Sequence, residues 1–245
     1  MTAPAPTPSR ARTPARPRRT YARPVTHADA ALTVGSFLLA TGLGLGLVTA
    51  LLFSGFEPDA AVAGGIPTTI VLWFLALWYS LRGRGWTWGD IGLGRGGPPA
   101  GRWLWQVGLA YLVMMTLTVL IGSQFLTPDA AQQDNVMAAG ISFGPVALLA
   151  LGLAVVVVGP LVEEVVFRRI ILGWLESRVG FVVALLVQAA LFAVMHIIPQ
   201  VMILTFFLGI VAGLLARLHR SLWPALALHC LNNAIAVTVM MATLS

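Results

Sequence analysis

Long runs without a charged side chain constrain this chain more than any other feature of its sequence. Charged residues make up 10% of its 245 residues and hydrophobic residues 58%, a balance unlike that of an ordinary soluble domain. A membrane-spanning helix needs about 20 mostly apolar residues, and each uncharged run is long enough for at least one. The sequence therefore predicts an all-α, polytopic membrane helical bundle with about seven transmembrane helices, at residues 31–54, 62–81, 104–126, 143–168, 180–198, 201–217 and 222–244.

The uncharged run 179–216 is too long for a single span. Pro199 and Gln200 lie near its middle, and proline disfavours a continuous helix, so a tight hairpin between two shorter helices is expected there. Two GxxxG spacings, Gly42 with Gly46 and Gly209 with Gly213, favour close helix–helix packing over dimerisation.

The arginines predict how the chain is oriented in the membrane. All fifteen cations are arginine, and the connections that hold Glu57 and Asp59, or Asp129 and Asp134, contain none. With seven spans every arginine falls on one side, so the positive-inside rule predicts a cytoplasmic N-terminus and a C-terminus outside. The net charge of +6 is accounted for by attraction to an anionic lipid bilayer, so no nucleic-acid partner is expected.

Composition divides the chain into three regions. Residues 1–28 are rich in arginine and proline and predict a disordered cytoplasmic tail. Residues 29–142 hold the N-terminal membrane helices and loops, among them a glycine-rich segment, 83–101, whose Trp86 and Trp88 are expected at headgroup level. Residues 143–245 contain the polar residues of the predicted spans and form the expected catalytic core. The single cysteine, Cys230, excludes an internal disulfide.

Two adjacent glutamates end a long apolar run in the fourth predicted span. Neighbouring helical residues point about 100° apart, so Glu163 and Glu164 are expected to face different surroundings. Glu164 lies four residues before Arg168, the favourable spacing for an intrahelical ion pair, whereas Glu163 has no cation at that spacing. We therefore expect a structural Glu164–Arg168 pair and a Glu163 that is free to act on water. The alternative is that both are interfacial charges.

Polar residues also interrupt two later spans. His196 ends the helix predicted after 180, with Phe192 one turn earlier on the same face. His229 and Asn233 are spaced i, i+4 and therefore share a face of the last helix, where two adjacent donors can stabilise an oxyanion. The alternative for each is a hydrogen bond between helices.

The simple topology separates these residues in depth. Glu163 and His229 are predicted about two turns from the cytoplasmic edge, whereas His196 lies near the far end of its span. They converge only if the helix that carries His196 starts deeper, tilts, or follows an interfacial segment at 170–182.

These motifs together resemble those of the CAAX prenyl endopeptidases, also called CPBP or Abi intramembrane proteases. The resemblance covers about residues 145–240. It rests on an EExxxR motif at Glu163, Glu164 and Arg168, an FxxxH motif at Phe192 and His196, and an HxxxN motif at His229 and Asn233. Phe206, Gly209 and Gly213 resemble the glycine-containing helix that the family places between the last two motifs.

The resemblance implies a role for each of these residues. Glu163 is similar to the family's catalytic glutamate, and His196 to its water-positioning histidine. His229 and Asn233 match the pair that stabilises the tetrahedral oxyanion. The implied activity is endoproteolysis of a membrane-associated protein or peptide, with or without a lipid modification, through a water activated by Glu163.

Other functions and a metal stay open at this stage. No metal ligand is assigned, but a divalent metal such as zinc would use Glu163, His196 and His229 as a His2Glu set. The main alternative function is a non-catalytic membrane scaffold or immunity-type protein of the same fold. A proton-coupled transporter is disfavoured because no inverted repeat relates the two halves.

Overall fold

Long apolar helices build the protein, as its sequence predicts. The computed structural model describes residues 21, 23–94, 99–124 and 144–244, and these contain helices and no strands. Lipid cannot satisfy backbone hydrogen bonds, so a helix is the structure that these runs adopt in a membrane. Within these described residues, six helices are long and apolar enough to cross a membrane: α1 (His27–Phe53), α2 (Pro58–Arg82), α4 (Leu104–Gly122), the continuous run Pro145–Val179, α10 (Pro199–His219) and α11 (Trp223–Leu244). The seventh predicted span is the shorter apolar helix α9 (Phe181–Val194).

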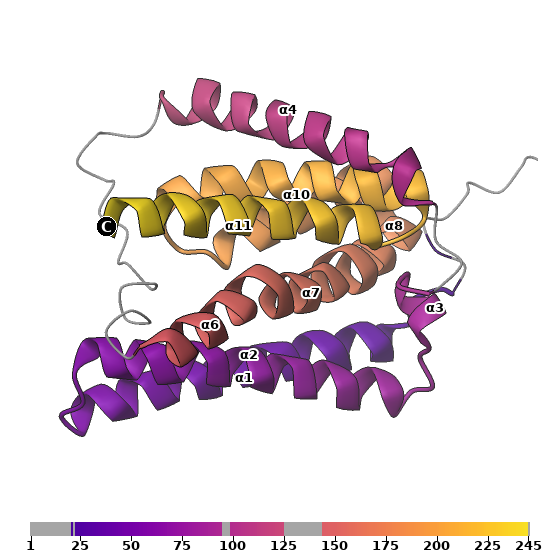
Figure 1. Cartoon of the computed structure of the whole chain (residues 1–245). Helices are drawn as coiled ribbons and strands as arrows, with labels where there is room; N and C mark the ends of the chain where they lie inside the picture. Colours follow the sequence, from indigo (N-terminus) through magenta and orange to yellow (C-terminus); the bar gives the residue numbers. More distant parts are fainter. Residues whose placement is uncertain (1–20, 22, 95–98, 125–143, 245) are drawn as a thin grey trace, which may run out of the picture.

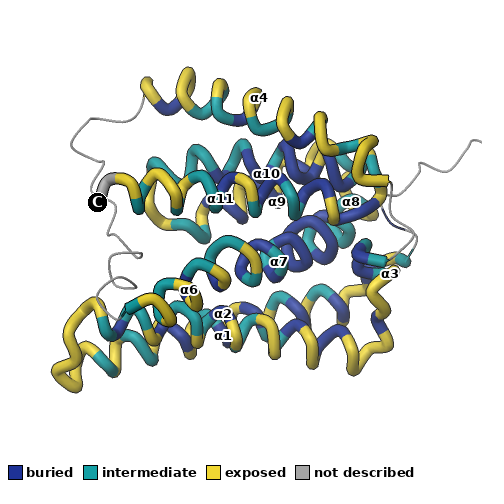
Figure 2. The backbone as a smooth tube through the Cα atoms, viewed as in Figure 1, coloured by how far each residue is buried: buried dark blue, intermediate teal, exposed yellow. Residues whose placement is uncertain are grey.

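The run Pro145–Val179 lies between two groups of helices (Figure 1). The α1–α2 hairpin contacts one side of it, whereas α9, α10 and α11 lie on the other side, with α4 against α10 and α11. Burial is concentrated where the second half of the run meets α9 and α10 (Figure 2). The best-packed part of the molecule therefore surrounds the residues that follow Gly159.

The central run changes its winding on both sides of the two glutamates. It consists of α6 (Pro145–Leu153), the π-helical segment η3 (Ala154–Val158), α7 (Gly159–Glu164), a second π-helical segment η4 (Val165–Ile171) and α8 (Leu172–Val179). Pro160 has no N–H to donate to the preceding turn, which favours the wider winding before it. π-Helical insertions are frequent at functional sites, and here they flank the two glutamates.

The predicted end of this span at residue 168 is wrong. The helix continues to Val179, and Gly180 makes the turn with a φ of 79°. The charges of Arg168 and Arg169 suggested an end there, but both side chains are buried inside the protein. Tertiary contacts therefore allow the helix to continue past them.

The predicted hairpin at Pro199 is confirmed. α9 ends at Val194, and Pro199 is the first residue of α10, where its missing N–H costs nothing. A Cβ on Gly209 would lie 2.8 Å from the Cα of Ala189 on α9, so the second GxxxG pair packs these helices closely. The first pair does not: a Cβ on Gly42 or Gly46 would meet no atom within 4 Å.

The arginine-rich ends of the helices are covered by chain segments. Residues 1–20 and 22 of the predicted disordered tail lie outside the described residues, whereas Tyr21 and Val25 within it are buried. The Arg169 guanidinium donates hydrogen bonds to the carbonyls of Asp90 and Arg23.

The loop after α2 contributes to the same cover. It carries the short helix α3 (Trp88–Ile91) and the 3-10 turn η1 (Ala100–Arg102). Trp86 is buried, and its ring centroid lies 4.6 Å from the Arg169 guanidinium. Its indole therefore packs inside the protein. Trp88 is half exposed.

Candidate active site

A buried imidazole lies between the two adjacent glutamates. The Nδ1 of His229 is 2.8 Å from Oε1 of Glu164, and its Nε2 is 3.5 Å from Oε2 of Glu163. The side chains of Glu164 and His229 are 0% and 2% exposed, and that of Glu163 is 16% exposed. The helix α11 therefore places His229 directly against α7.

This geometry corrects the expectation that the two glutamates face different surroundings. The two nitrogens of an imidazole lie on different edges of the ring, and a glutamate side chain has several rotatable bonds. Two carboxylates that leave the helix about 100° apart therefore reach the same ring from two sides. The helical wheel alone does not exclude this arrangement, because it ignores what inserts between the side chains.

Glu164 also forms the predicted pair with Arg168. Its Oε2 lies 3.3 Å from Nε of Arg168, whose side chain is 0% exposed. The guanidinium stacks over the Phe192 ring at 4.1 Å from the centroid. Glu164 thus contacts both a permanent cation and His229, a second role that the i, i+4 spacing does not reveal.

The direction of the hydrogen bond between His229 and Glu164 follows from the chemistry of the carboxylate. An ionised Glu164 only accepts, so the His229 Nδ1 is the donor toward it.

Phe192 links this cluster to His196. Its ring centroid lies 5.6 Å from that of His229 and 4.8 Å from that of His196, and it packs on Phe167 at 4.9 Å. His196 is half-buried in the turn after α9, and its Nδ1 is 2.8 Å from the Phe192 carbonyl oxygen. A carbonyl oxygen accepts only, so Nδ1 is the donor, and in the neutral form of the ring Nε2 is an acceptor.

The long central run also resolves the expected difference in depth. Glu164 lies sixteen residues before the Gly180 turn and His196 lies sixteen residues after it. Residues that are equally far from the turn of a helical hairpin lie side by side. The helix at 170–179, which occupies the proposed interfacial segment, therefore brings His196 level with the glutamates. Among the described residues, no hydrogen bond or ion pair joins His196 directly to Glu163 or His229.

Asn233 faces the same central run as His229. Its Nδ2 donates to the carbonyl of Val155 in η3 at 2.9 Å, and the neighbouring Asn232 donates to its Oδ1 at 3.1 Å. Proline has no N–H and so frees carbonyls of the preceding turn for other donors, and Asn233 supplies one in η3. Asn232 was not predicted, and its adjacency to Asn233 within an apolar helix is the only signal in the sequence.

The conditional zinc set is not assembled in the described part of the chain. There, no group of three or more histidine, cysteine, aspartate or glutamate side chains has an arrangement that could hold a metal ion. Glu163 and His229 meet, but His196 faces them across the Phe192 ring.

The fold and the site together define a multi-pass membrane protein with a buried Glu–His–Glu cluster. Residues 145–235 match the family model described as type II CAAX prenyl endopeptidase, Rce1-like. The family resemblance predicted from the three motifs is therefore confirmed over this segment.

The curated proteins include a distant relative. The protein named "Putative membrane peptidase YdiL" from Bacillus subtilis (strain 168) is 28% identical over 81 residues, which cover 33% of this chain and 33% of the relative. The match thus spans about one third of each protein. No solved structure matches the chain.

Proposed function

We propose that this protein is an intramembrane endopeptidase that hydrolyses a peptide bond with a water activated by Glu163. The observation that carries the proposal is the Glu163–His229–Glu164 cluster, buried inside the segment that matches the endopeptidase family. Three ionisable groups inside an apolar bundle are costly to bury, and their mutual contacts are suited to proton transfer.

We assign one further proton to this cluster, because its two carboxylates and one guanidinium otherwise leave a buried net charge of −1. With the proton on His229, Glu164 orients the imidazolium through Nδ1, and Glu163 is an ionised base. Glu163 accepts a proton from the attacking water, whose oxygen bonds to the peptide carbonyl carbon. The His229 Nε2–H then donates to the carbonyl oxygen as it becomes an oxyanion. Collapse of this intermediate breaks the C–N bond, and Glu163 returns the proton to the leaving amine.

His196 and Asn233 act beside this cluster. The Nε2 of His196 accepts a hydrogen bond from the attacking water and so fixes its position. Asn233 uses one amide hydrogen on Val155 and retains a second for the oxyanion. Arg168 and His196 both contact the Phe192 ring, and we assign the guanidinium to Glu164, with which it forms an ion pair.

The substrate proposed is a membrane-associated protein or peptide. The name of the matched family points to a prenylated tail, but a shared fold does not transfer substrate class. The proposal therefore covers substrates with and without a lipid. On the predicted orientation, Glu163 and His229 lie in the cytoplasmic half of the membrane.

The test compares two glutamine substitutions on the purified protein with a peptide library. Glu163→Gln preserves size and removes the base, so cleavage is expected to fall by at least about 100-fold while the melting temperature changes little. Glu57→Gln is the matched control, because this exposed carboxylate precedes α2 and makes no capping hydrogen bond. Each variant is measured with and without a chelator, which tests the metal alternative.

Two results would contradict the proposal. Full cleavage by a well-folded Glu163→Gln protein would exclude Glu163 as the base. A cellular phenotype that survives alanine at Glu163, His196 and His229 together would support the non-catalytic scaffold or immunity-type protein.

A further inference from the structure

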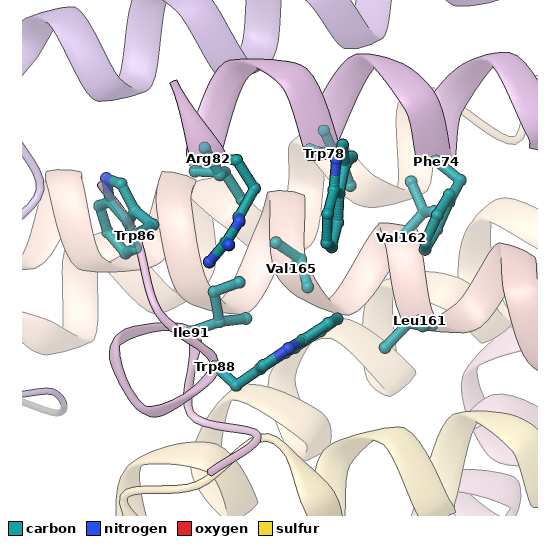
Figure 3. A pocket seen from close by; sticks show the side chains of 11 residues that line it. Phe74, Trp78, Arg82, Trp86, Trp88, Ile91, Leu161, Val162 and Val165 are labelled. Carbon is teal, nitrogen blue, oxygen red and sulfur yellow. The ribbon is translucent and has the colours of Figure 1, made fainter. Parts of the chain in front are cut away.

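An apolar recess lies on the α2 side of the central run, separate from the Glu–His–Glu cluster. Its volume is about 500 Å³, including the part that is open to the outside. Residues of α2, the following loop, α3 and the central run line it, and Figure 3 shows most of them: Phe74, Trp78, Arg82, Trp86, Trp88, Ile91, Leu161, Val162 and Val165.

The polarity of this recess changes in one direction along α2. Phe74, Trp78 and Arg82 follow one another at four-residue intervals, so they share a helix face over about 12 Å. Arg82 lies at the helix end, Trp78 in the middle and Phe74 farthest from that end (Figure 3). A membrane phospholipid has the same order, with a charged phosphate, a polar backbone and an apolar acyl chain.

The cation at the rim is available to an external anion. Arg82 is exposed, and its guanidinium stacks over Trp78 at 5.2 Å from the ring centroid. Within the described ranges, no carboxylate lies at ion-pair distance from Arg82. Two other arginines near this end of α2 do have such partners: Arg84 pairs with Asp29, and Arg23 pairs with Asp90. Among the described residues, Arg82 is thus a cation at the edge of the recess that has no carboxylate as an ion-pair partner.

Two indoles form the sides of the recess between this cation and its deep end. The Trp78 and Trp88 rings lie 6.3 Å apart at an angle of 50°, and both are about half exposed. Indoles are enriched at the level of lipid headgroups. Leu161 and Val162 form the apolar wall below them.

We propose that this recess binds one anionic phospholipid of the bilayer. Arg82 contacts the phosphate, Trp78 and Trp88 flank the glycerol region, and an acyl chain lies against Phe74 and Leu161. The predicted orientation supports this occupant, because the arginine-rich side faces the cytoplasmic leaflet, whose anionic lipids attract basic residues. The proposal does not depend on the peptidase activity.

The test is native mass spectrometry of the purified protein titrated with phosphatidylglycerol or phosphatidylcholine in neutral detergent. The wild type is expected to retain phosphatidylglycerol preferentially. Arg82→Gln is expected to reduce that retention about fivefold, the effect of one surface arginine. Arg178→Gln is the matched control, because Arg178 is also exposed and stacks on an indole, that of Trp174, but does not line the recess.

A second variant tests the acyl-chain position. Leu161 is half-buried and lines the recess, so Leu161→Trp fills the part that the acyl chain would occupy. This variant is expected to retain less of both lipids. Its melting temperature is measured to check that the protein is still folded. Equal retention by the wild type, Arg82→Gln and Leu161→Trp would overturn the proposal. Retention of a farnesylated peptide that is independent of Arg82, without retention of phosphatidylglycerol, would also overturn it and assign the recess to a substrate's lipid tail.

Discussion

The Glu164–Arg168 pair provides the sharpest test of how the site is held together. Both side chains are 0% exposed, and their closest charged atoms are 3.3 Å apart. Arg168→Met keeps an apolar side chain against Phe192 and removes the only permanent cation of the cluster. The Glu164 carboxylate then remains buried with a compensating charge only if His229 holds its extra proton.

The magnitude follows from the cost of an unpaired buried charge. Breaking such a pair by removing one partner costs about 3–5 kcal/mol, so Arg168→Met should shift the folding equilibrium by two to four orders of magnitude. The cost of Glu164→Gln in folding free energy should be of similar size, because this substitution leaves the Arg168 guanidinium without its carboxylate partner. The double variant leaves neither charge, and its cost is expected to fall short of the sum of the single costs by about 0.5–3 kcal/mol.

The assay is equilibrium unfolding in mixed detergent micelles, with helical circular dichroism as the readout. Arg178→Met serves as the control: the exposed Arg178 makes no ion pair with a carboxylate among the described residues, and a change within about 0.5 kcal/mol is expected. Additive costs for the two single substitutions would refute the reasoning, because they would show that the two charges do not stabilise one another.

Two further predictions test the packing and the loop at the arginine-rich end. Gly209→Leu should destabilise the protein by about 1–3 kcal/mol, because the new Cβ would lie 2.8 Å from a Cα of α9. Gly42→Ala is the control: its added Cβ would meet no atom within 4 Å, so the midpoint of thermal unfolding should stay unchanged or rise slightly. Burial raises the pKa of Asp90, but hydrogen bonds from Thr87 and Arg23 outweigh burial, and the net pKa lies below its usual 3.8. This carboxylate therefore stabilises the fold above pH 3.8 and loses its contribution as the pH falls through the lower, folded-state pKa. Asp90→Asn should flatten the acid limb of the stability profile, and an unchanged limb would contradict the assignment.

The sequence alone determines the class of fold because its information is local. Runs without charge predict membrane helices, since lipid leaves the backbone no other partners than its own. Proline predicts the break at Pro199 for an equally local reason. The spacing of Glu164 and Arg168 predicts their ion pair, because residues four apart on a helix are neighbours.

Contacts between distant segments were decided only by the tertiary structure. The central helix continues past Arg168 and Arg169 because Phe192, Tyr21 and Trp86 surround those charges, and no local rule anticipates partners so far along the chain. That continuation brings His196 level with the glutamates. The same long-range packing inserts His229 between Glu163 and Glu164, which a helical wheel drawn for one isolated helix cannot represent.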